Sequence, residues 1–145
     1  MRETLKNKFL NRETLFAGWT SIGHPQVTEM LLRSGVDWLG IDIEHSTISQ
    51  ENSQRIIAAC HANEVSCLPR VASHNPEAIK RLLDSGADGV IVPTVETVEQ
   101  VEKIIEWTKY PPIGKRGFGV ARAQGYGHDF EKYITEWNKS SVLVI

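Results

Sequence analysis

The feature that most constrains the fold is a regular alternation of strand-like and helix-like segments along residues 15–108. Short apolar runs, typical of buried strands, alternate with segments whose apolar residues recur at helical spacing. The apolar runs, with a fifth candidate at the end, cover residues 15–19, 38–43, 65–68, 89–93 and 142–145. The helix-like segments lie near residues 25–34, 49–60, 75–86, 97–108 and 130–138. Such alternation predicts βαβ units and a parallel sheet.

Individual residues mark where several of these helices should begin and end. Pro25 suits the first turn of a helix, and Ser49 and Asn75 are side chains that can cap one. Gly35 and Gly86 follow two of the helix-like segments, where a residue with positive φ commonly ends a helix. Residues 1–14 are predicted to form a short helix or arm, and residues 110–127 a long loop.

Length and composition restrict the class of protein. A chain of 145 residues with 41% hydrophobic and 23% charged residues is typical of one globular domain. A net charge of −2 gives no general attraction to nucleic acid or to an anionic membrane. No apolar run approaches the roughly 18–20 residues that a membrane span needs. Cys60 and Cys67 are too few for a disulfide framework and match no common zinc spacing, so we expect a reduced, cytoplasmic protein.

The number of strand–helix units falls short of a complete barrel. A TIM (β/α)₈ barrel has eight units and needs ~250 residues, whereas this sequence supplies about four and a half units. A final parallel strand without a covering helix would also leave one face of the sheet exposed. We therefore expect residues 1–145 to be the N-terminal part of a single barrel domain. The alternative is a small open α/β sheet that is complete in itself.

Polar side chains follow three of the predicted strands. They are Glu44 and His45, then Arg70, then Thr94 and Glu96. Ligands of parallel α/β folds bind outside the carboxyl ends of the strands, so these side chains are predicted to converge on one site. His45 can carry a proton near neutral pH, and Arg70 can hold a carboxylate or neutralise an enolate. Asp42 and Glu44 offer the oxygen ligands that bind a divalent metal ion or its waters. Together they suggest chemistry on a carboxylate-bearing substrate at a metal centre.

Five stretches of the sequence resemble, in order, the signature of the HpcH/HpaI aldolase family. They are residues 35–45 (GVDWLGIDIEH), 69–71 (PRV), 79–89 (IKRLLDSGADG), 90–93 (VIVP) and 110–117 (YPPIGKRG). The resemblance extends over nearly the whole chain, from about Phe16 to Ile145. It implies a (β/α)₈ barrel and a metal-dependent lyase. Members of the family cleave 4-hydroxy-2-keto and 2-keto-3-deoxy acids to pyruvate and an aldehyde.

The resemblance also implies roles for individual residues. His45 would be the general base that takes the proton of the C4 hydroxyl, through a water held by the metal. Arg70 would hold the keto-acid end and stabilise the pyruvate enolate, and Asp42 would position metal-bound water. Asp84 would pair with His45. Near the end of a helix, however, Asp84 is expected at the opposite end of the sheet from His45. It is therefore either a helix-end residue or a side chain that reaches His45 of a neighbouring subunit.

The metal ligands that the resemblance implies are a Glu after the fifth strand and an Asp after the sixth. Both would fall beyond Ile145, so no metal ligand is expected within this chain. The divalent metal, Mg, Mn or Co, would belong to the full-length parent, and residues 1–145 alone are expected to be inactive. The implied partners are a small keto acid and further copies of the protein.

Two other functional readings are open. One is a citryl- or malyl-CoA-type lyase on the same barrel. The other is a catalytically incomplete half barrel that acts only in assembly. Among other residues, His61 is predicted to be solvated on a helix face, and residues 114–119 to form a lid or substrate-side loop rather than a nucleotide-binding loop.

Overall fold

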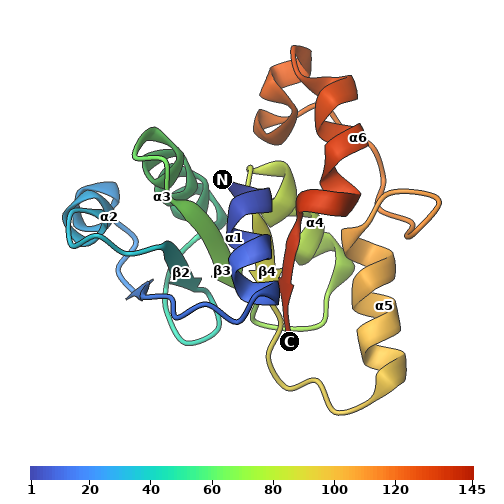
Figure 1. Cartoon of the computed structure of the whole chain (residues 1–145), viewed down its shortest axis with the longest axis horizontal. Coiled ribbons are helices and arrows are strands. Elements are labelled where there is room, and N and C mark those ends of the chain that lie inside the picture. The colour runs from blue at the N-terminus through green and yellow to red at the C-terminus, as the bar shows by residue number, and fades with distance from the viewer.

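The structure is a computed structural model that describes residues 1–145, and it contains one five-stranded parallel sheet (Figure 1). The strands are β1 (Ala17–Thr20), β2 (Trp38–Asp42), β3 (Ser66–Arg70), β4 (Gly89–Ile91) and β5 (Val142–Val144). The helices are α1 (Arg2–Leu10), α2 (Pro25–Leu32), α3 (Gln50–Ala62), α4 (Pro76–Asp84), α5 (Val98–Thr108) and α6 (Phe130–Ser140). Consecutive strands are neighbours in the order β1-β2-β3-β4-β5, which confirms the predicted parallel sheet.

The two faces of the sheet are covered by different helices. Leu39, Ile41 and Cys67 belong to a large apolar cluster with side chains of α2, α3, α4 and α5. Because successive strand residues point to opposite faces, Leu68 faces the other way, where it packs against Leu5 of α1. In Figure 1, α1 accordingly lies in front of the strands. We call the face that meets α1 the inner face.

The caps that the sequence predicts are present. Ser49 accepts a hydrogen bond from the backbone N–H of Asn52, and Asn75 accepts one from Ala78. Gly35 and Gly86 have φ of +81° and +106°, the left-handed conformation that ends helices at little cost for glycine.

Two local predictions differ from the structure. The stretch of residues 110–127 is not all loop, because a short 3₁₀ segment, Arg122–Gly127, forms within it. His61 is not solvated: its side chain is 21% exposed and its Nε2 lies 3.1 Å from a carboxylate oxygen of Asp88. Its other ring nitrogen lies 3.3 Å from Nη1 of Arg122. Both partners are distant in the sequence, so helical periodicity alone could not reveal them. None of the helices combines the length and apolar character that crossing a bilayer requires.

The contact between β4 and β5 requires a glycine. A Cβ atom on Gly89 would overlap the carbonyl group of Val142, which is backbone and cannot move aside. We therefore expect Gly89→Ala to lower the free energy of unfolding by about 2–3 kcal/mol, measured by urea denaturation. The matched control is Gly117→Ala, because a Cβ at Gly117 meets no atom within 4 Å. Equal stabilities of the two variants would contradict the tight packing of this strand pair.

Candidate active site

The register of β2 against β3 brings Asp42 and Arg70 together. The two residues are paired neighbours at the carboxyl ends of adjacent strands. Arg70 donates from Nε to Oδ1 of Asp42 at 3.2 Å and from Nη2 to Oδ2 at 2.6 Å. This two-point contact fixes the plane of the guanidinium group as well as its position. Asp42 is buried and the Arg70 side chain is 23% exposed, so the pair lies at the boundary of the interior.

Glu44 and His45 lie next to this pair. Nη1 of Arg70 is 3.3 Å from a carboxylate oxygen of Glu44, and the same oxygen is 3.6 Å from Nε2 of His45. The backbone N–H of His45 donates to Oδ1 of Asp42 at 3.0 Å, which holds the turn after β2 against the pair. The His45 ring itself is 70% exposed. The structure thus brings Asp42, Glu44, His45 and Arg70 into one cluster, as their positions at the strand ends suggested.

The residues after β4 do not join this cluster. The hydroxyl of Thr94 donates to the carbonyl oxygen of Pro93, and the backbone N–H of Glu96 donates to the side chain of Gln100 in α5. They form the connection into α5 instead. Prediction from strand ends alone was therefore correct for β2 and β3 and wrong for β4.

Charge and burial set the protonation of Asp42. Burial disfavours its charged form, but hydrogen bonds from Arg70 and from the His45 backbone outweigh that effect, and the pKa of Asp42 lies below its ordinary value of 3.8. The Asp42 carboxylate raises the pKa of Arg70 further above its already high value, against the opposing effect of desolvation. The pair is therefore ionised at neutral pH and acts as a fixed dipole at the strand ends.

This pair makes stability depend on acid pH. Because the pKa of Asp42 is lower in the folded state, its contribution to stability is complete above the unfolded value of 3.8 and is lost as pH falls through the folded value. Urea unfolding between about pH 5 and about pH 2 should show a steeper loss for the wild type than for Asp42→Asn. Identical pH dependence of the two proteins would show that the contact contributes nothing.

Asp84 does not approach His45 within the chain. It is the last residue of α4, which leads back to the amino end of β4, whereas His45 follows the carboxyl end of β2. Oδ1 of Asp84 instead accepts a hydrogen bond of 2.7 Å from Nη2 of Arg116. The Arg116 side chain is fully buried, with its guanidinium carbon 4.7 Å from the ring centroids of Tyr110 and Trp137. The buried Arg116 side chain thus fixes Asp84 near the amino ends of the strands, at the opposite end of the sheet from His45.

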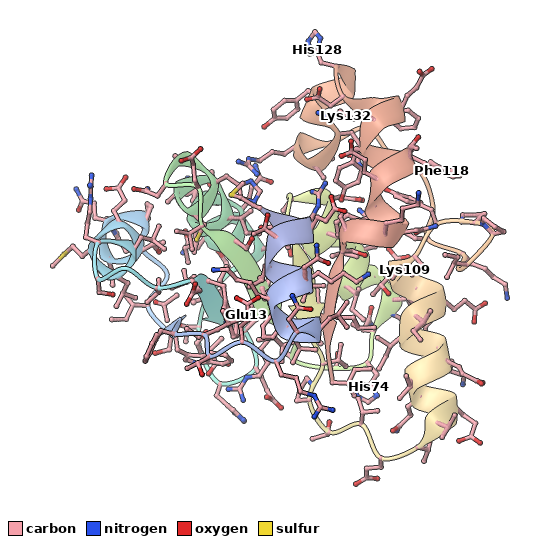
Figure 2. All side chains as sticks on the ribbon, in the orientation of Figure 1. Glu13, His74, Lys109, Phe118, His128 and Lys132 are labelled. Carbon is pink, nitrogen blue, oxygen red and sulfur yellow. The ribbon has the colours of Figure 1, made fainter.

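The loop that carries Arg116 therefore lies away from the strand-end cluster of its own chain. In Figure 2, Phe118 of this loop is well separated from His74, whose ring bonds the Pro93 carbonyl oxygen beyond the end of β4. The Phe118 ring stacks on Tyr110 at a centroid distance of 4.9 Å and is 57% exposed. Residues 114–119 are predicted to form a lid or substrate-side loop, but they do not lie beside the strand-end cluster of the same chain.

The side chains present do not form a set that could hold a metal ion. No three His, Cys, Asp or Glu side chains are arranged for this in the structure. Both Asp42 oxygens already accept hydrogen bonds from Arg70, which leaves Glu44 and His45 as the nearest side chains that could bind a metal ion. Two ligands are fewer than the four to six or more that divalent ions take in proteins. These residues by themselves therefore do not complete the coordination of a divalent ion.

Sequence comparison decides the family. The profile of the HpcH/HpaI aldolase/citrate lyase family matches residues 16–145. The chain belongs to this family. It is 37% identical over 130 residues to a 4-hydroxy-2-oxovalerate aldolase of Novosphingobium aromaticivorans, a match covering 87% of this chain and 48% of that protein. It is 38% identical over 153 residues to a 2-keto-3-deoxy-L-rhamnonate aldolase of Klebsiella pneumoniae, a match covering 100% of this chain and 56% of that protein.

The structure of the chain matches the same family. A HpcH/HpaI aldolase/citrate lyase family protein from Burkholderia cenocepacia superposes with a TM-score of 0.91 at 28% identity. The match covers 97% of this chain and 58% of that protein. The chain thus spans about half the length of the family members that it matches. The predicted fold, the N-terminal portion of a TIM (β/α)₈ barrel, is confirmed.

Proposed function

We propose that this chain is the N-terminal part of a divalent-metal-dependent class II aldolase that cleaves 4-hydroxy-2-keto or 2-keto-3-deoxy acids to pyruvate and an aldehyde. The observation that carries the proposal is the Arg70–Asp42 pair with His45 beside it, at the strand ends of a chain from this family. The names of the relatives support the same chemistry, since they describe aldolases of keto acids.

The chemistry needs a base and a site for negative charge. In the proposed reaction, neutral His45 accepts the proton of the substrate C4 hydroxyl, and the C3–C4 bond breaks as the C4–O bond becomes a carbonyl. The electron pair of the broken bond forms the C2–C3 double bond while the pair of the C2 carbonyl moves to its oxygen, which gives the enolate of pyruvate and releases the aldehyde. A proton equivalent to the one taken by His45 then returns to C3, which yields pyruvate and restores the base.

Arg70 is suited to stabilise that enolate. Asp42 occupies the Nε and Nη2 side of the guanidinium group, and Nη1 lies 3.3 Å from a carboxylate oxygen of Glu44. The second N–H of Nη2 and those of Nη1, beside Glu44, are the donors that remain for a substrate carboxylate or enolate oxygen. Because Asp42 fixes the group before substrate binds, little reorganisation is needed when negative charge develops. Glu44, next to both Arg70 and His45, is proposed to help position water at the metal.

An assay on the full-length protein tests the proposal. We expect pyruvate release from 4-hydroxy-2-keto acids in the presence of Mn²⁺ or Mg²⁺, and its loss when EDTA removes the metal. Cleavage of citryl- or malyl-CoA in place of keto acids would assign the alternative lyase chemistry. No cleavage of any of these substrates with any divalent ion would overturn the proposal and leave a role in assembly.

We also propose that Asp84 serves His45 of a neighbouring subunit, because Arg116 holds it firmly at the far end of the sheet from its own His45. Subunits with His45→Ala, mixed with subunits with Asp84→Ala, should then regain part of the activity that each variant lacks alone. The recovered fraction should approach one quarter for random pairing of equal amounts, because about half of the pairs are mixed and each holds one intact site. Mixed oligomers without recovery would contradict action between subunits.

A further inference from the structure

Trp19 lies over the guanidinium group of Arg70. It belongs to β1, where its register partner on β2 is Gly40. The guanidinium carbon of Arg70 is 5.1 Å from the centroid of the Trp19 ring, within the range of a cation–π contact. Trp19 is 44% exposed, so it is not a buried residue that fills the core. Trp19, Gly40, Asp42 and Arg70 all lie at the carboxyl half of the inner face.

Gly40 is what allows the ring to lie there. A Cβ atom on Gly40 would overlap the six-membered ring of Trp19, within 2.6 Å of its Cζ3 atom. The φ of Gly40 is not positive, so backbone conformation does not require glycine at this position. The glycine instead leaves a flat surface on β2, and the indole ring rests on that surface while it reaches toward Arg70. This gives a reason for the glycine in the run Trp38–Asp42.

We propose that Trp19, resting on Gly40, is a positioning residue for Arg70. Asp42 fixes one edge of the guanidinium group by two hydrogen bonds, and the central carbon of the group lies over the indole ring, 5.1 Å from its centroid. The two contacts together restrict the movement of the group. The N–H groups that Asp42 does not occupy, including those of Nη1 beside Glu44, are then held in place before the substrate binds. This inference rests on the proposed role of Arg70 and adds the residues that hold it.

Activity of the full-length protein provides the first test. We expect Trp19→Leu to lower kcat/KM about tenfold and Trp19→Phe, which keeps an aromatic face, to lower it by about threefold or less. Gly40→Ala should cause a loss similar to that of Trp19→Leu, because it displaces the ring. In a protein that already carries Trp19→Leu, Gly40→Ala should lower kcat/KM by about a further twofold or less, because the indole ring that the new Cβ would meet is absent. The matched control is Phe16→Leu, since Phe16 is exposed and outside the cluster, and it should leave kcat/KM unchanged.

A double-mutant cycle separates positioning from direct contact with substrate. If Trp19 acts through Arg70, Trp19→Leu should change kcat/KM by about twofold or less in a protein that already carries Arg70→Lys. An undiminished tenfold loss in that background would mean that Trp19 contacts the substrate itself, and would overturn the inference.

A measurement without substrate keeps the inference testable if the aldolase proposal fails. The ring current of Trp19 should shift the Nε–H proton resonance of Arg70 in arginine-labelled protein. Trp19→Leu and Gly40→Ala should move this resonance toward the position of an unstacked arginine, whereas Phe16→Leu should not. An unmoved resonance in both variants would overturn the inference, whatever the enzyme cleaves.

Discussion

Replacing His45 by alanine in the full-length protein is expected to reduce kcat for keto-acid cleavage by about 10²–10⁴-fold, the usual contribution of a general base. Folding should be unaffected, because the His45 side chain is 70% exposed and its charged neighbour is Glu44 at 3.6 Å. The contact that does support the fold is made by the His45 backbone N–H, which alanine retains.

Steady-state kinetics together with urea denaturation test this expectation. The matched control is His128→Ala, because His128 is also exposed but lies at the opposite end of the molecule from the strand ends (Figure 2). His128→Ala should retain full activity. A His45→Ala protein with wild-type stability and more than about one tenth of wild-type kcat would show that another group accepts the proton.

Arg70→Lys is the second large effect that we expect, with a fall in kcat/KM of about 10²–10³-fold. Lysine keeps the positive charge but cannot make the two-point contact with Asp42, so neither the position nor the orientation of the cation is retained. Stability should also fall, because the Asp42 carboxylate is buried and loses two donors.

The same substitution elsewhere provides the control. Arg55 pairs with Glu51 on the surface of α3, where the Arg55 side chain is 58% exposed. Exposed pairs of this kind contribute little to stability, so Arg55→Lys should change neither activity nor the urea midpoint. Equal behaviour of Arg55→Lys and Arg70→Lys would argue that Arg70 acts only as a diffuse positive charge.

Helix starts and ends were predictable because they depend on neighbours in the sequence. Ser49 and Asn75 each cap a backbone N–H only three residues away, and Gly35 ends a helix through its own φ. The prediction that His61 is solvated is wrong because its partners, Asp88 and Arg122, lie 27 and 61 positions further along the chain. Helical spacing predicts which face of the helix a residue occupies, but it does not predict which residues pack against that face.

The candidate site was predictable only in part, for a related reason. A histidine and two acids within four residues of a strand end are visible in the sequence, and so is an arginine at the next strand end. Trp19 was missed as a member of the site. Its place over Arg70 depends on the register of three strands and on the missing side chain of Gly40.

The sequence by itself determined the alternation of strands and helices, the caps, and the residue types at the ends of β2 and β3. These follow from apolar periodicity and from short-range hydrogen bonding, which any stretch of chain carries within itself. Only the tertiary structure decided that Arg70 is held by Asp42 and Trp19, and that Asp84 is held by Arg116 at the other end of the sheet. Those contacts join residues about 30 to 50 positions apart in the sequence. They depend on strand register and helix packing, which are properties of the whole fold.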